Sequence, residues 1–103
     1  MPAYVIAQVD IRNPEAYERY RDIVPDTIAK HGGRYLARGG ACETLEGSWM
    51  PRRLVILEFP DADRARAWWN SPDYAEAKAL RQANADTELL LVEGLPAPAL
   101  PRG

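Results

Sequence analysis

Two proline-marked helix starts, each lying between β-strand patterns, most narrowly limit the folds open to this chain. Asn13-Pro14-Glu15 and Ser71-Pro72-Asp73 each combine a capping side chain, a proline at the first helical position and an acidic first turn. Apolar runs typical of strands surround them, at residues 3–11, 34–45, 52–59 and 87–93. The resulting β-α-β-β-α-β order predicts a ferredoxin-like α+β domain, a four-stranded antiparallel sheet with its helices on one face.

Proline and glycine residues within these segments refine where the helices and strands begin and end. Pro25 lies inside the apolar pattern of the first helix and is expected to kink it or break it briefly, before a stop at residues 30–32. The second helical region is expected over 62–70, with a restart at Ser71 that runs to about Ala83. Gly39-Gly40 interrupts the second strand pattern and predicts a bulge or a close backbone approach there.

The length of 103 residues fits one domain. We expect that domain at residues 1–95, followed by a proline-rich tail at 96–103 that is either disordered or extended. The longest purely apolar run, residues 54–57, is far too short to span a bilayer, and the first residues lack a secretory pattern. A cytoplasmic protein without membrane contact is the resulting expectation.

Composition argues against several classes of function. A formal net charge of -2 and a pI near 5.4 do not favour a nucleic-acid partner, which normally meets a basic face. Cys42 and His31 are the only residues of their types, so no thiolate zinc cluster is expected. His31 lies just before a helix-ending glycine, where a basic group favours the helix dipole. We therefore expect no metal and no bound cofactor.

The strand alternation predicts one apolar sheet face for the helices and one mixed face without cover. The second face collects residues from the first and third strands, namely Tyr4, Ile6, Gln8, Leu54, Ile56 and Glu58. Exposed apolar area of this size usually marks an interface. We expect a homodimer through this face, although a one-residue slip in register would exchange the two faces.

A polar cluster on the sheet is the first candidate site. Arg38 is placed on the second strand, on the face with Leu36, and could reach Glu58 on the third. A buried carboxylate needs a partner or a shifted pKa. Arg38 would then orient an anionic or enolate oxygen, and Glu58 would hold Arg38 or act as a base. The alternative is a structural ion pair.

An aromatic group is the second candidate. Tyr20 and Tyr74, with Ser71 beside them, are expected to line a pocket between helix and sheet, supported by Arg53 and Glu46. The alternative is that Ser71 only caps a helix and the aromatic side chains only pack.

The second residue offers a minor alternative. Removal of Met1 would expose the secondary amine of Pro2, which in tautomerases abstracts a proton next to a carbonyl. Arg34, Arg38 or Arg53 could serve as its partner.

Three segments carry a family resemblance: residues 32–40, residues 45–47 with 53–60, and Trp68-Trp69-Asn70-Ser71-Pro72-Asp73-Tyr74. As a set, over residues 2–95, they resemble the bacterial family of domain of unknown function 1330, in the dimeric α/β-barrel superfamily. The resemblance implies a ferredoxin-like protomer whose sheet packs face to face with a second copy. That superfamily includes cofactor-independent monooxygenases, isomerases and haem proteins, so it assigns no chemistry by fold alone.

Two functions follow as expectations. One is a homodimer that binds a small, partly apolar organic molecule and acts as a cofactor-independent oxygenase or isomerase. The other is a non-catalytic sensor or interaction domain whose sheet face serves only to dimerise. A sizeable pocket with polar lining would favour the first, and densely packed side chains would favour the second.

Overall fold

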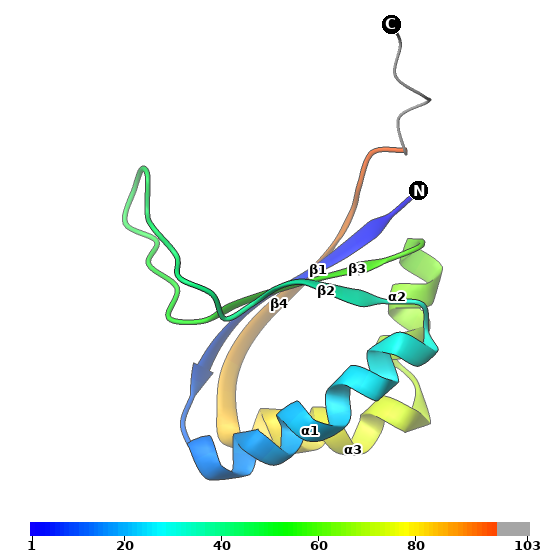
Figure 1. The fold of residues 1–103 in the computed structure, drawn as a ribbon, viewed down its shortest axis with the longest axis horizontal. Coiled ribbons are helices and arrows are strands. Elements are labelled where there is room, and N and C mark those ends of the chain that lie inside the picture. The colour runs from blue at the N-terminus through cyan, green and yellow to red at the C-terminus, as the bar shows by residue number, and fades with distance from the viewer. Residues whose placement is uncertain (97–103) are drawn as a thin grey trace, which may run out of the picture.

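Four antiparallel strands form one sheet in the order β2-β3-β1-β4, and the helices lie on one of its faces (Figure 1). The computed structural model describes residues 1–96, so the predicted tail lies almost entirely outside the described residues. The elements are β1 (Ala3–Ile11), α1 (Pro14–Lys30), β2 (Arg34–Arg38), β3 (Leu54–Phe59), α2 (Ala62–Trp69), α3 (Pro72–Asn84) and β4 (Ala85–Glu93). This arrangement confirms the predicted fold class.

The capping side chains place the helices as the sequence predicts. The Asn13 side chain accepts a hydrogen bond from the Ala16 amide at 3.3 Å, and Asp61 accepts one from the Arg64 amide at 2.7 Å. These bonds satisfy amides that a helix start leaves without partners. The predicted break at Pro25 is wrong, because α1 continues through that residue to Lys30.

The second strand ends earlier than the sequence indicates. It stops at Arg38, and residues 39–53, here called the arm, leave the sheet and rise on its helix-free side (Figure 1). Gly39 starts this departure with a left-handed φ of 71°. The irregularity in β2 also lies elsewhere than predicted, between Tyr35 and Ala37 and not at Gly39-Gly40.

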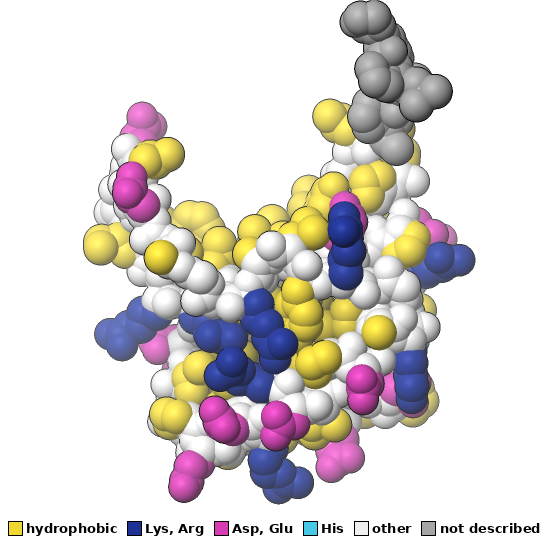
Figure 2. All heavy atoms as spheres, in the orientation of Figure 1, with side chains coloured by type: hydrophobic (Ala, Val, Ile, Leu, Met, Phe, Trp, Pro, Cys, Tyr) yellow, Lys and Arg dark blue, Asp and Glu magenta, His cyan; other side chains and the backbone are white. Residues whose placement is uncertain are grey.

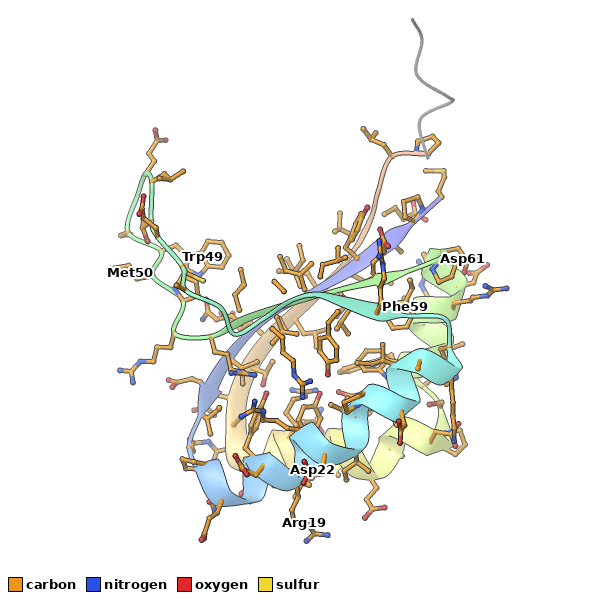
Figure 3. The ribbon with its side chains drawn as sticks, viewed as in Figure 1. Arg19, Asp22, Trp49, Met50, Phe59 and Asp61 are labelled. Carbon is orange, nitrogen blue, oxygen red and sulfur yellow. The ribbon has the colours of Figure 1, made fainter. Side chains whose placement is uncertain are left out.

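The core lies between the sheet and the helices. Alternate β1 residues from Ala3 to Val9 face it and are buried, as the alternation predicts. Trp68 and Tyr74 stack at 4.1 Å between ring centroids, and Phe59 packs on Trp68 at 5.5 Å. Figure 3 shows Phe59 at the end of β3, on the helix side of the sheet. No helix within residues 1–96 has the length and apolar character to cross a membrane.

Candidate functional site

A small cavity lies on the helix side of the sheet, enclosed by α1, α3 and the inner side chains of β1 and β3. Its volume is about 30 Å³, which is room for roughly one or two water molecules. Its polar lining comes from arginines and tyrosines, namely Tyr17, Tyr20, Arg21, Tyr35, Arg38, Arg53 and Arg81. Figure 2 shows Lys and Arg side chains gathered at this level, between the sheet and α1. We call this space the inner cavity.

Two of the predicted tyrosines meet inside the protein. The Tyr20 and Tyr74 hydroxyls lie 3.1 Å apart, and both side chains are buried. Arg81, only 4% exposed, donates its Nε–H to the Tyr74 hydroxyl at 3.4 Å. Burial raises the pKa of Tyr20 far above its ordinary value, and the neighbouring Tyr74 adds to that rise. Tyr20 therefore keeps its proton at neutral pH, and either hydroxyl of the pair can donate to the other.

Arg38 closes the gap between β2 and α1. Its Nη2 donates to the Arg21 carbonyl at 3.2 Å, and its Cζ lies 4.5 Å from the Tyr35 ring centroid. In a regular helix the Arg21 carbonyl would accept from residue 25, but Pro25 has no N–H. The proline thus leaves an acceptor that Arg38 takes up.

The expected approach of Arg38 to Glu58 is wrong, and a bulge explains why. Arg34 pairs with Glu58 across the strands, but Leu36 has no partner, so Arg38 pairs with Val55. One extra residue turns the rest of the strand over. Arg38 consequently faces the helices, whereas Glu58 faces the other side.

Arg53 reaches the inner cavity from the start of β3. Its Cζ lies 5.8 Å from the Tyr17 ring centroid, and its Nε is buried without a hydrogen-bond partner. The guanidinium fits there because Gly39 has no side chain: a Cβ at that position would lie 2.7 Å from Arg53 Cζ. Gly39 therefore makes room for Arg53 as well as turning the chain.

Charge in the inner cavity is one-sided. No lining residue is acidic, and no carboxylate among residues 1–96 forms a salt bridge with Arg38, Arg53 or Arg81. Burial acts to lower the pKa of Arg81, but the Tyr74 and Tyr20 oxygens outweigh it and raise that pKa above its ordinary value. The cavity thus presents cations and hydroxyl donors with no anion.

The remaining predicted residues lie elsewhere. Glu58 accepts from Arg34 Nε at 2.8 Å, and both line a separate shallow hollow with Pro2. Glu46 is exposed on the arm. Ser71 accepts from the Tyr74 amide at 3.2 Å and so caps α3, as its structural alternative predicts. Within the described part of the chain, no group of three or more His, Cys, Asp or Glu side chains could hold a metal ion.

The model of the family described as domain of unknown function (DUF1330) matches residues 2–95. The chain belongs to this family. No curated protein matches the sequence. Among solved structures, a protein of unknown function from Rhodopseudomonas palustris superposes with a TM-score of 0.75 at 23% identity, covering 92% of this chain and 83% of that one.

Two further neighbours share the architecture of this DUF1330 chain. A dimeric ferredoxin-like protein of unknown function from Jannaschia gives a TM-score of 0.67 at 15% identity, over 91% of this chain and 100% of the other. SnoaB, a cofactor-independent oxygenase from Streptomyces nogalater, gives 0.62 at 14% identity over 98% of each chain. Likeness at these identities establishes the fold and leaves the activity open.

The helix-free face of this DUF1330 protein is apolar and concave. Tyr4, Ile6, Ile56, Leu90 and Val92 lie on it, as the strand pairing shows. Leu90 is 67% exposed and Val92 45% exposed. The arm stands over one end of this face, where the Trp49 indole donates to the Gln8 side chain. Figure 2 shows the apolar surface hollowed beside the arm, and Figure 3 shows Trp49 and Met50 on the arm itself.

Arg81 is the important cavity residue that the sequence predictions missed. It lies four residues after Ala77 and seven after Tyr74, so the three share the buried face of α3. A charged residue at a core position of an amphipathic helix is the signal that would have found it.

Proposed function

We propose that this DUF1330 protein is a homodimer that binds a small, partly apolar organic anion at the inner cavity, and that it acts without a bound cofactor, either as an oxygenase with molecular oxygen as the oxidant or as an isomerase. The observation that carries the proposal is that Arg38, Arg53 and Arg81 line one space and that none of them forms a salt bridge with a described carboxylate. Unpaired cations are costly to enclose, so an arrangement of this kind is typical of a place where an anion binds.

The inner cavity has to open for such a ligand. Organic ligands occupy roughly 300–1,000 Å³, far more than the present 30 Å³. Arg38 is the side chain best placed to move, because it is exposed and held by one bond to the Arg21 carbonyl. Arg38 directly precedes the arm and Arg53 is its last residue, so movement of the arm would reach both.

The lining favours chemistry through a stabilised oxyanion. The arginines of the lining are hydrogen-bond donors, the Tyr20 hydroxyl is paired with that of Tyr74 behind it, and no lining side chain is a carboxylate or a histidine. Donors fixed around a developing negative charge stabilise an enolate-like intermediate. Because the lining holds no carboxylate or histidine base, the oxyanion would have to be present when the substrate binds, as in an enolate or phenolate. Glu58 has no part in this proposal, since it faces the other side of the sheet.

The dimer in the proposal forms through the helix-free face. That face is apolar and exposed, with Leu90 on the edge strand β4 and the arm at its end. A second copy of this concave sheet would bury the apolar side chains that a single chain leaves in water. The dimeric ferredoxin-like neighbour supports this choice.

Native mass spectrometry of the protein purified from its own host tests both parts. We expect a mass of two chains plus one constant small adduct, whose identity gives the substrate class. A dimer without an adduct would favour the alternative of a sensor or interaction domain. A monomer would contradict the role of the helix-free face.

Variants at the cavity then test the site. Arg38→Ala should weaken binding of the identified adduct while thermal unfolding stays within about 2 °C of the parent, because Arg38 lies at an exposed mouth. Arg19→Ala removes the same charge from the outer side of α1 and is the matched control (Figure 3). Equal affinity in both variants would contradict the assignment of Arg38.

A pair of glycine variants tests Arg53 without touching it. Gly39→Ala places a methyl group against the Arg53 guanidinium, whereas Gly47→Ala has the same left-handed backbone strain with no atom within 4 Å. We expect both to lose similar stability and only Gly39→Ala to lose ligand affinity. A shared loss of affinity would remove Arg53 from the site.

A tautomerase is a second candidate function, and the residues that lie around Pro2 favour it. Pro2, Arg34 and Glu58 line the same hollow, so of the three arginines considered as partners it is Arg34 that lies near the chain start. If Pro2 is the base, Pro2→Ala abolishes enol-to-keto conversion of α-keto acids, and Arg38→Ala does not.

A further inference from the structure

A second hollow runs along the inner side of β4, the edge strand of the sheet. Near α2 it measures about 310 Å³ and is lined by Val5, Ala65, Arg66, Trp68, Trp69, Leu89 and Leu91. Near the start of β4 it measures about 340 Å³, with a lining of Trp69, Arg81, Gln82, Ala85, Asp86, Thr87 and Leu89. Because the two parts share Trp69 and Leu89, we treat them as one space and call it the β4 cleft. Each part is large enough for a small organic ligand.

The β4 cleft is apolar along its length and cationic at one place. Leu89 and Leu91 come from the inner side of β4 and are only partly buried, and Trp69 faces them from α2. Arg81 lines both this cleft and the inner cavity, so its guanidinium lies where the two spaces meet. A ligand in the cleft can therefore contact Arg81 without passing the Arg38 mouth.

Thr87 adds an unused polar group at the same place. Its Oγ1 is buried with no hydrogen-bond partner, and Thr87 and Arg81 line the same part of the cleft. A buried hydroxyl without a partner costs free energy that a ligand oxygen would recover. A guanidinium without a carboxylate partner among the described residues and a hydroxyl without a partner there together match a carboxylate, which accepts from both.

Other charged residues at the cleft already have partners. Asp86 lies 3.2 Å from Arg12, and Arg66 lies 3.3 Å from Asp63. Arg81 has no carboxylate partner among the described residues, and it is 4% exposed. The positive charge available to a ligand is thus the one beside Thr87.

We infer that the β4 cleft binds an apolar monocarboxylate, with the carboxylate on Arg81 and the Thr87 hydroxyl and the hydrocarbon body against Trp69, Leu89 and Leu91. The inference rests on the proposed function, since Arg81 serves both spaces. It names the ligand class and adds an approach to Arg81 from the edge of β4.

Octanoate is a suitable probe, and the three tryptophans show where it binds. In ¹H–¹⁵N NMR each indole N–H gives a separate signal: Trp69 and the more deeply buried Trp68 both line the cleft, whereas Trp49 reports the arm on the opposite face. We expect octanoate to shift the Trp69 signal in a saturable way and leave the Trp49 signal in place. Octanamide, equal in shape but uncharged, should bind at least about tenfold more weakly.

Variants separate the carboxylate contact from general packing. Thr87→Val keeps the shape and removes only a hydroxyl that has no partner, so it should fold normally and weaken octanoate severalfold while octanamide is unaffected. Arg81→Gln should weaken octanoate by about tenfold or more. Arg19→Gln changes the net charge equally, far from the cleft, and should leave the octanoate affinity unchanged.

Three results would overturn the inference. They are equal binding of octanoate and octanamide, a shift confined to the Trp49 signal, and octanoate binding that Thr87→Val leaves intact. If native mass spectrometry shows a constant adduct that Arg38→Ala removes, and the protein does not bind octanoate, the proposed function stands and only the monocarboxylate inference is rejected. If octanoate binds at the cleft and Arg38→Ala affects the binding of no ligand, the monocarboxylate inference stands and the proposed function is rejected.

Discussion

The two faces of the sheet differ in the kind of side chain that lacks a partner. On the inner face, arginines and tyrosine hydroxyls are enclosed with no anion beside them. On the helix-free face the ion pair between Arg34 and Glu58 is complete, and apolar side chains such as Leu90 are the groups without cover. Unpaired positive charge favours binding of a small anion, whereas uncovered apolar area favours packing against another large apolar surface. In the proposed function, the same strands thus separate ligand binding from assembly.

Truncation of the inner face should have the largest effect. Phe59 is fully buried and packs on Trp68. Phe59→Ala should lower the free energy of unfolding by about 3–5 kcal/mol, through lost burial and the cavity left behind. Urea unfolding followed by circular dichroism measures this. A loss below about 1 kcal/mol would mean that the inner face packs less tightly than described.

A charge on the helix-free face should act on assembly instead of folding. Leu90→Glu places a carboxylate where the proposed partner packs, and burial of an unpaired charge opposes association by about 3 kcal/mol or more. We expect a monomer at micromolar concentration in analytical ultracentrifugation, with unchanged helix content. Glu76→Gln, on the exposed side of α3, controls for a charge change. Persistence of the dimer in Leu90→Glu would place the interface elsewhere.

Two inner threonines offer a matched test of paired and unpaired hydroxyls. Thr27 donates to the Val24 carbonyl at 2.7 Å and accepts from the Trp68 indole at 3.1 Å, whereas the Thr87 hydroxyl has no partner. Thr27→Val should cost about 1–3 kcal/mol, since it leaves a buried indole N–H unsatisfied. Thr87→Val should cost nothing or stabilise slightly. Equal losses in thermal unfolding would show that Thr87 also has a structural bond.

Alkaline pH should lower the stability of the folded chain through two tyrosines on the helix side of the sheet. Burial raises the pKa of Tyr20 above its ordinary value of 10.0, and burial raises the pKa of Tyr35 as well. Below pH 10 both residues are protonated whether folded or unfolded, so the stability is unaffected. Above it the unfolded chain loses those protons first, and stability should fall by roughly 1 kcal/mol per pH unit for each tyrosine. Tyr20→Phe should reduce that slope, and an unchanged slope would contradict the burial effect.

The fold was predictable because its signals are local. Capping groups at Asn13, Asp61 and Ser71 and the alternation in β1 each depend on a few neighbouring residues. The break expected at Pro25 did not form, because helix loss there would also unpack Val24 and Ile28 from the core. Packing over the whole of α1 outweighed one missing amide donor.

The candidate site was predictable only in part. Tyr20, Tyr74, Arg38 and Arg53 do gather on the helix side, but Glu58 does not join them. A bulge is decided by how two strands pair, which no run of residues in β2 reveals. Each member also comes from a separate element, so their meeting depends on tertiary contacts.

The unpaired Leu36 in β2 has a consequence for how this family diversifies. If β2 paired regularly from Arg34 onward, Leu36 would lie opposite Ile56 and Arg38 opposite Leu54, on the helix-free face. The inner cavity would then lose a cation although Arg38 itself had not been substituted. Loss of Leu36, in contrast, would leave Arg38 opposite Val55, facing the helices. Changes that remove the bulge while keeping the length of β2 are therefore an evolutionary route to a different ligand charge.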